Sequence, residues 1–202
     1  YYLGKINTIV CGFDFKFGVR GSGNVKTLQE HKEFETVVVS EITYDGYKVG
    51  STHIRDLINS GLVEQIKEVM GDYYSVQGVV IHGAKKGRTI GYPTANLHIN
   101  DEEKLIPANG VYAVKVKGDC TNHAIVDGMM NIGIRPTVDG QKKVIEVNIF
   151  NFDQDIYEQY ITVLVYEFIR GEVKFDGLDA LKNQLGQDKI TASAILTKYE
   201  DK

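Results

Sequence analysis

The stretch YSVQGVVIH, residues 74–82, opens a part of the chain in which strand-like runs follow one another. The later runs lie at 110–117, 121–127, 144–151 and 160–169, and turn-forming residues separate them. Successive strands without intervening helices are typical of an antiparallel barrel or sandwich. Helical periodicity returns only after Phe175, where residues 176–185 and 188–199 each begin with an aspartate that can cap a helix. We therefore predict a β domain that ends in two helices.

Upstream of Asp72, strands and helices alternate instead. Strand-like runs lie at 6–11 and 34–42, and helix-like runs at 24–31, 51–59 and 62–70. Asn24 and Ser51 are placed to cap the first two helices, and Gly71 to end the third. Continuous apolar strands are typical of a parallel sheet covered on both sides. This order predicts part of an α/β domain over residues 1–72, with a boundary near residue 72 and no flexible linker.

Composition limits the classes of function. The chain has 202 residues, 43% hydrophobic and 25% charged, which is typical of a globular protein with a substantial core. Its net charge of −4 argues against a nucleic acid partner. The two cysteines, Cys11 and Cys120, have no metal-ligand spacing, and we expect Cys11 to be a buried thiol. Since no apolar run has the length of a membrane helix and no signal peptide is visible, we expect a cytoplasmic protein without a membrane partner.

The loop HGAKKGRTIGYPTAN, residues 82–96, combines glycines, cations, a hydroxyl and a carboxamide. Glycine lets the backbone approach a ligand closely, and exposed N–H groups in such loops bind anions. Thr94 carries a hard oxygen that suits Mg²⁺, and Asn96 can offer oxygen to a metal or a hydrogen bond to phosphate. The loop matches neither the P-loop nor the dinucleotide-binding pattern. From the residues alone, an ordinary solvated hairpin loop remains the alternative.

The segment VIEVNIFNF, residues 144–152, contains a candidate general base. Its isoleucines and valines at odd positions face one side of a strand, so Glu146 and Asn148 share the other. A carboxylate on a rigid strand suits proton abstraction because its position is fixed before substrate arrives. A half-exposed strand with a polar outer face is the alternative that the pattern leaves open.

Five motifs resemble those of the riboflavin kinase family and occur in the family's order. They are HGAKKGRTIGYPTANL, GVYAV, NIGIRPTV, IEVNIFNFDQDIY and FIRGEVKFDGLDALKNQL. Upstream, GFDFKFG and VGSTHIR resemble later motifs of the bacterial FMN adenylyltransferase domain. The whole is similar to the bacterial bifunctional riboflavin kinase/FAD synthetase family. The resemblance implies part of a Rossmann-like nucleotidyltransferase domain at 1–72, then an antiparallel β-barrel riboflavin kinase domain at 73–202 with C-terminal helices.

The resemblance also implies roles for individual residues. Thr94 and Asn96 would hold Mg²⁺ and the ATP phosphates, and Glu146 would be the catalytic base. Further nucleotide contacts are expected at Gly83, Arg88, Ile149, Asn151 and Tyr157, and flavin contacts at Arg170 and Phe175. A planar cation and an aromatic ring suit an isoalloxazine. The implied reaction is phosphoryl transfer from ATP to the 5′-hydroxyl of riboflavin, giving FMN.

For the N-terminal part, the resemblance implies nucleotide or FMN contacts at Asp14 and Phe17. Ser51, Thr52 and Arg55 begin a predicted helix whose N-terminus could hold a triphosphate, although a simple cap and a surface arginine are the alternative. The early His-x-Gly-His signature of these adenylyltransferases is absent. We expect this chain not to convert FMN to FAD by itself, and an upstream segment to restore that activity.

The sequence departs from the family pattern at a few positions, namely Gly50, Ala84, Lys86 and Asn148. Two other functions remain open: a flavin-binding regulator or reservoir without turnover, and a barrel that binds oligonucleotides. The intact Thr94, Asn96 and Glu146 argue against the first, and the acidic composition argues against the second. We expect riboflavin, FMN and ATP as small-molecule partners, and a homo-oligomer remains open.

Overall fold

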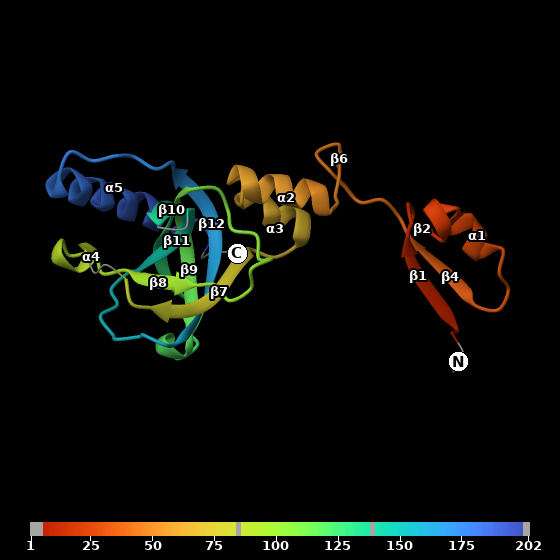
Figure 1. The fold of residues 1–202 in the computed structure, drawn as a ribbon, viewed down its shortest axis with the longest axis horizontal. Coiled ribbons are helices and arrows are strands. Elements are labelled where there is room, and N and C mark those ends of the chain that lie inside the picture. Colours follow the sequence, from red (N-terminus) through yellow and green to blue (C-terminus); the bar gives the residue numbers. More distant parts are fainter. Residues whose placement is uncertain (1–5, 84–85, 138–139, 200–202) are drawn as a thin grey trace. The chain divides into compact units, whose positions relative to one another are not determined.

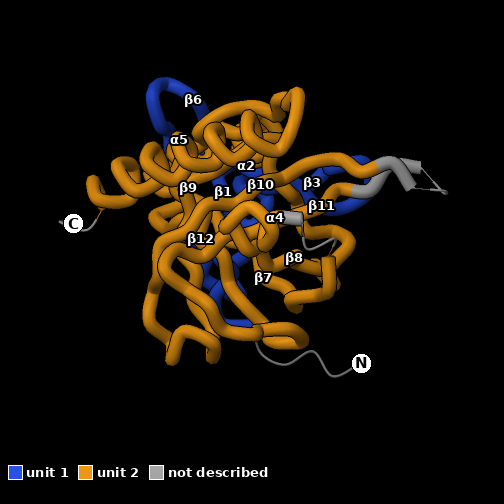
Figure 2. The backbone as a smooth tube through the Cα atoms, turned by 90° about the vertical axis from the view of Figure 1, so that its left-hand side faces the viewer, with its two compact units in different colours: residues 1–51 blue, residues 52–202 orange. Residues whose placement is uncertain are grey.

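The computed structural model describes residues 6–83, 86–137 and 140–199. The chain forms two compact units, Tyr1–Ser51 and Thr52–Lys202 (Figure 2). Figure 1 labels the helices and strands along the chain.

The first unit contains a parallel strand pair, as the sequence predicted. Strand β1 (Thr8–Gly12) pairs with β4 (Glu35–Val39), and helix α1 (Val25–Gln29) lies between them in the chain. The side chain of Asn24 accepts hydrogen bonds from the backbone N–H groups of Lys26 and Thr27, which confirms the predicted cap. The smaller elements are β2 (Lys16–Phe17), η1 (Val19–Gly21), β3 (Gly23–Asn24), β5 (Thr43–Tyr44) and β6 (Tyr47–Lys48).

Helices α2 (Ser51–Ser60) and α3 (Glu64–Met70) come next. Helix α3 ends at Gly71, whose φ of 80° is the left-handed conformation that glycine adopts readily. Leu57, Ile58 and Ile66 from these helices, and Val63 at the N-cap of α3, are buried in the same core as the strands that follow. The second compact unit therefore includes residues 52–72, which the sequence assigned to the preceding domain. The position of the domain boundary stays a prediction.

Six antiparallel strands close into a barrel in the order β10-β11-β8-β7-β12-β9. Their bounds are β7 (Tyr74–Ile81), β8 (Ala95–His98), β9 (Gly110–Gly118), β10 (Val126–Thr137), β11 (Gly140–Ile149) and β12 (Tyr160–Arg170). The predicted antiparallel barrel is therefore confirmed. Its interior is filled by apolar side chains such as Val76, Tyr112, Val147 and Val163, so it is a packed core and not a channel.

Among the barrel strands, one prediction was wrong in its position and one strand was missed. The expected strand at 121–127 is instead the turn η2 (Asp119–Thr121) followed by a loop, and β10 begins only at Val126. The hydroxyl of Thr121 bonds the carbonyls of Gly118 and Ala124, which closes the turn. Strand β8 was not predicted, because four residues that include an asparagine and a histidine give no strong strand signal.

The C-terminus is one helix, α5 (Leu178–Thr197), and not the two helices expected. Asp188 lies buried in the middle of it and bonds a side chain of the barrel, so it does not cap a second helix. Gly177 occupies the N-cap position without a side-chain hydrogen bond, so Asp176 is not the cap either. Ala192, Ile195 and Leu196 pack with Met129 and other apolar side chains on the outer wall of the barrel.

Both cysteines are buried and unpaired, as expected for Cys11. Within the residues that the structure describes, no helix is long and apolar enough to cross a membrane.

Candidate active site

Strand pairing brings the predicted base and one predicted metal ligand together. In β11, Glu146 lies directly opposite Asn96 of β8 on one side and Asn131 of β10 on the other. The neighbouring Ile145 and Val147 belong to the barrel core, so Glu146 projects from the outer face. Side chains directly opposite each other on adjacent strands share a face, with Cβ atoms about 5 Å apart. The carboxyl of Glu146 and the carboxamide of Asn96 therefore project on the same side.

The glycine-rich loop folds over Asn96 and Thr94. A Cβ added to Gly83 would lie 2.1 Å from Nδ2 of Asn96, and one added to Gly87 would lie 2.2 Å from the carbonyl oxygen of Tyr92 and 3.6 Å from Oγ1 of Thr94. Both approaches need the absence of a side chain. Ala84 and Lys85, and the side chain of Lys86, lie outside the described residues.

Asn148 holds the backbone that leads into Thr94. Its Nδ2 donates a 2.6 Å hydrogen bond to the carbonyl oxygen of Pro93, and the side chain is buried. The alternation along the strand predicts that Asn148 shares a face with Glu146, but it does not predict a role for Asn148. The polar position of Asn148, two residues from Glu146, was the available sign of a role. Its partner Pro93 lies 55 residues away in the chain and could not be identified from the pattern.

A cavity of about 280 Å³ lies on this outer face, between the barrel wall and α5. Its polar and charged lining comes from Thr94, Asn131, Arg135, Glu146, Asn148, Arg170 and Glu172. Its apolar lining comes from Ile90, Tyr92, Val111, Met129, Met130, Val173, Phe175, Leu181 and Leu185. Apolar walls with a few convergent polar groups are typical of a site for a small organic ligand. Both predicted flavin-contact residues, Arg170 and Phe175, line this cavity together with Glu146.

A smaller pocket of about 50 Å³ shares Thr94 with that cavity. Three other residues predicted to contact nucleotide line it, namely Arg88, Ile149 and Tyr157. The Tyr157 ring lies 3.8 Å from the His82 ring, centroid to centroid. Asn151 lines a separate hollow, to which Ile149 also contributes. Thr94 therefore lines both the cavity with the predicted flavin contacts and the pocket with the predicted nucleotide contacts.

Glu146 has a partner that sequence analysis did not assign. Nη2 of Arg135 donates a 2.6 Å hydrogen bond to Oε1 of Glu146, and the side chains are 48% and 24% exposed respectively. Within the described part of the chain, this is the hydrogen bond that fixes the carboxylate, and it leaves Oε2 available to another group. The motif NIGIRPTV contained Arg135 but gave no sign of which side chain it would meet.

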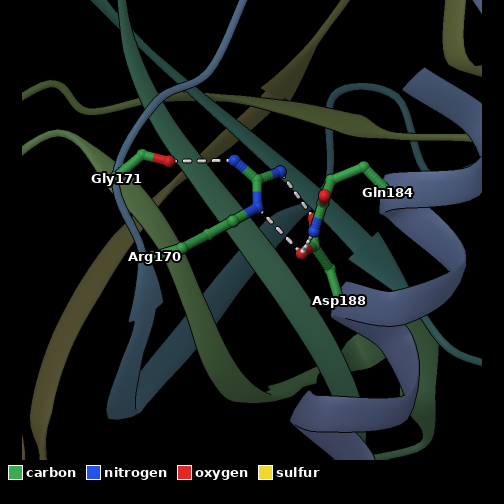
Figure 3. A network of polar contacts seen from close by, with 4 residues as sticks. All are labelled: Arg170, Gly171, Gln184 and Asp188. Carbon is green, nitrogen blue, oxygen red and sulfur yellow. Dashed lines mark hydrogen bonds and ion pairs between the residues drawn. The ribbon is translucent and has the colours of Figure 1, made fainter. Parts of the chain in front are cut away.

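Arg170 is held from two sides (Figure 3). Its Nε and Nη2 donate to the two carboxylate oxygens of Asp188 at 2.8 and 2.6 Å, and its Nη1 donates to the carbonyl oxygen of Gly171 at 2.9 Å. Gln184 donates a 2.9 Å hydrogen bond to Oδ1 of Asp188. The guanidinium carbon lies 5.8 Å from the centre of the Phe175 ring. This side-chain contact between β12 and α5 is not visible in the sequence, where Asp188 is expected to cap a second helix.

The residues predicted for adenylyl transfer divide between the two compact units. Asp14, Phe17 and Ser51 belong to the first, and Thr52 and Arg55 belong to the second. Asp14 forms an ion pair with Lys48, and this hydrogen bond lowers the pKa of the Asp14 carboxyl. The Phe17 ring stacks on Phe15 with 5.9 Å between centroids. The roles of these five residues stay predictions.

The donor set beside Glu146 fits a metal that arrives with a nucleotide. Among the described residues, no group of three or more histidine, cysteine, aspartate or glutamate side chains could hold a metal ion. Thr94 and Asn96 offer a hydroxyl and a carboxamide oxygen, both hard ligands that suit Mg²⁺. Because Mg²⁺ keeps several waters and completes its shell with substrate phosphates, two protein oxygens are sufficient.

Family comparisons cover both units. The Flavokinase model, described as riboflavin kinase, matches residues 70–196, and the FAD_syn model, described as FAD synthetase, matches residues 2–53.

Among curated proteins, the bifunctional riboflavin kinase/FMN adenylyltransferase of Listeria monocytogenes is 39% identical over 199 residues, covering 97% of this chain and 62% of that protein. Its Bacillus subtilis counterpart is 37% identical over 198 residues, covering 95% of this chain and 61% of that protein. The chain thus spans about three fifths of the length of these relatives.

A crystal structure described as a macrolide-efflux protein from Streptococcus pneumoniae is also similar. It superposes with a TM-score of 0.85 at 36% identity, covering 92% of this chain and 60% of that one. The fold described above is therefore shared with a solved structure.

Proposed function

The chain belongs to the riboflavin kinase family, and from this we propose that it transfers the terminal phosphoryl group of ATP to the 5′-hydroxyl of riboflavin, giving FMN and ADP. The observation that carries the proposal is the position of Thr94, which lines both the 280 Å³ cavity and the smaller pocket. Glu146 lies on the cavity side of it. A substrate hydroxyl in the cavity would then meet a phosphate held at Thr94.

Riboflavin occupies the 280 Å³ cavity in this proposal. The ring system lies among the apolar side chains, with Arg170 and Phe175 in contact with it. The ribityl chain extends toward Glu146 and Thr94. Glu146 accepts the proton of the 5′-hydroxyl through Oε2, while Arg135 holds the other oxygen. Because β11 is paired on both sides, the carboxylate is fixed before substrate binds.

ATP occupies the side of Thr94 that faces Arg88, Ile149 and Tyr157. The backbone of the loop at Gly83 lies against the phosphates, while Gly87 lines the riboflavin cavity beside Thr94. Asn151 contributes at the neighbouring hollow. Thr94 and Asn96 would hold Mg²⁺, which supplies charge neutralisation on the phosphates when it is bound. Asn148 keeps Thr94 in place through its hydrogen bond to Pro93. Catalysis then depends mostly on positioning and electrostatics.

We further propose that residues 1–72 are part of an FMN adenylyltransferase domain, in which Asp14, Phe17, Ser51, Thr52 and Arg55 contact the nucleotide. The match of residues 2–53 to the FAD synthetase family supports this. The substrates are small molecules, with cytoplasmic biosynthesis as the setting. A non-catalytic flavin reservoir is not favoured, because Thr94 and Glu146 line the cavity and Asn96 lies opposite Glu146 on the neighbouring strand.

The test is conversion of riboflavin by the purified protein. With ATP and Mg²⁺ we expect FMN and ADP in equal amounts, resolved by chromatography. EDTA should abolish FMN formation, and excess Mg²⁺ should restore it. The neutral side chains of Thr94 and Asn96 cannot offset the charge of the ATP phosphates without the metal. Riboflavin that binds without forming FMN would instead establish the reservoir, and a protein that neither binds nor converts riboflavin would refute both.

A further inference from the structure

The contact between Arg170 and Asp188 places a buried charge in the middle of α5. Asp188 is 1% exposed, although it lies in the middle of the helix and not at either end. Gln184, one turn earlier on the same helix, donates to the carboxylate and thereby fixes its orientation. Leu181 and Leu185 of the same helix line the cavity (Figure 3 shows the polar contacts).

Stability alone is a weak reason for such a pair. Desolvation of two charges offsets much of their attraction, and well-packed apolar residues often replace a buried ion pair without loss. What the pair gives instead is geometry, because a bidentate contact between guanidinium and carboxylate permits a single relative orientation. A pair that fixes the direction of a side chain in a ligand cavity therefore points to a role in binding.

The donors of Arg170 are only partly used. A guanidinium has five N–H groups. Three of them donate to Asp188 and to Gly171, through Nε, Nη2 and Nη1. The other two, one on Nη1 and one on Nη2, have no acceptor among the described residues. Arg170 lines the 280 Å³ cavity, so these two donors are available to a ligand there.

We propose that Asp188 is a positioning residue of the flavin site, which holds Arg170 so that its two spare N–H groups donate to the carbonyl and ring-nitrogen acceptors of the isoalloxazine. Gln184 assists by orienting the carboxylate. Helix α5 is then part of the flavin site and not only a cover for the barrel. This inference rests on the proposed function and adds to it the residues that set the orientation of Arg170.

Asp188→Asn tests the role directly, because it keeps the shape of the side chain and replaces one acceptor by a donor. We expect the Kd of riboflavin, measured by equilibrium dialysis with MgADP present, and the KM for riboflavin to rise about tenfold, as for loss of a hydrogen bond between charged groups. The KM for ATP and kcat should stay within about twofold, because Arg170 does not line the pocket assigned to ATP. The matched control is Asp179→Asn, an exposed aspartate in the first turn of the same helix, which should change none of these values.

A double-mutant cycle separates positioning from simple support of the fold. In an Arg170→Lys background, Asp188→Asn should weaken riboflavin binding by much less than in the wild type, since lysine lacks the guanidinium group that Asp188 orients. A lower Tm for Asp188→Asn with unchanged riboflavin Kd and KM would overturn the proposal.

Gln184→Leu provides a second route if Asp188→Asn does not fold. It removes only the hydrogen bond that orients the carboxylate, and riboflavin binding should weaken about twofold to threefold. Unchanged binding would again refute the positioning role. A wild-type protein that binds no riboflavin would refute the proposed function itself, which is a different result from any of these.

Discussion

At the scale of single residues, the site depends on close packing between backbone and side chains around Thr94 and Asn96. Gly83 lies where any Cβ would overlap the Asn96 carboxamide. Asn96 lies directly opposite Glu146, because β8 and β11 are neighbouring strands. A change at Gly83 should therefore displace Asn96, the proposed ligand of Mg²⁺ and phosphate, without changing the fold of the barrel.

Gly83→Ala should raise the KM for MgATP at least about tenfold, because the new methyl group must displace Asn96. Steady-state kinetics of FMN formation measure this. Gly50→Ala is the matched control, since a Cβ there would meet no atom within 4 Å. Equal KM values for the two variants would mean that Asn96 does not hold the nucleotide.

The sequence predicted several residues of the candidate site, but not the residues that they contact. Alternation along residues 144–152 put Glu146 on the polar face, and the family resemblance nominated Thr94, Asn96 and Arg170. Their partners were not visible, because Asn148 meets Pro93, and Asp188 meets Arg170, only after the barrel closes and α5 packs on it. Pattern indicates which face a side chain occupies, whereas its partner depends on tertiary structure.

At the scale of elements, α5 contributes to the wall of the cavity and to the apolar side chains packed on the outer wall of the barrel. Leu196 is fully buried against the outer wall of the barrel, whereas Ile190 on the same helix is 64% exposed. The helix continues through Gly186 and Asp188 because burial of Ala192, Ile195 and Leu196 stabilises its second half. The sequence predicted a break here, since aspartate is common at helix starts, and tertiary packing overrode that local preference.

Leu196→Ala should lower the free energy of unfolding by about 2–5 kcal/mol, because it leaves a cavity between α5 and the barrel. Ile190→Ala, the control, should change it by no more than about 0.5 kcal/mol. Urea unfolding followed by circular dichroism gives both values. If Leu196→Ala costs as little as its control, α5 is not packed on the barrel as described.

At the scale of the whole molecule, the chain combines two compact units that divide after Ser51. In the sequence, alternating strands and helices give way to successive strands, which predicts a change of architecture near residue 72. The pattern did not reveal that α2, α3 and the N-cap of α3 contribute Leu57, Ile58, Val63 and Ile66 to the core that the barrel strands share. The apolar face of an amphipathic helix indicates that the helix packs on another surface. It does not indicate which of two neighbouring domains supplies that surface.

Two fragments test where the folding unit begins. Residues 52–202 should fold and form FMN at the rate of the full chain. Residues 73–202 should have a lower Tm or aggregate, because removal of four buried side chains costs more than a single large-to-small core substitution, itself about 2–5 kcal/mol. Thermal unfolding and FMN formation measured on both fragments decide the point. Equal stability of the two would place the boundary near residue 72 after all.

The most direct test of the account is turnover by Glu146→Gln, with Glu103→Gln as the control on an exposed loop. The amide keeps the size of the carboxyl but cannot accept the proton of the riboflavin hydroxyl. We predict that kcat for FMN formation falls about 10²–10⁴-fold while riboflavin still binds with its wild-type Kd. A Glu146→Gln protein that forms FMN at nearly the wild-type rate would contradict the assignment of Glu146 as the base and the mechanism built on it.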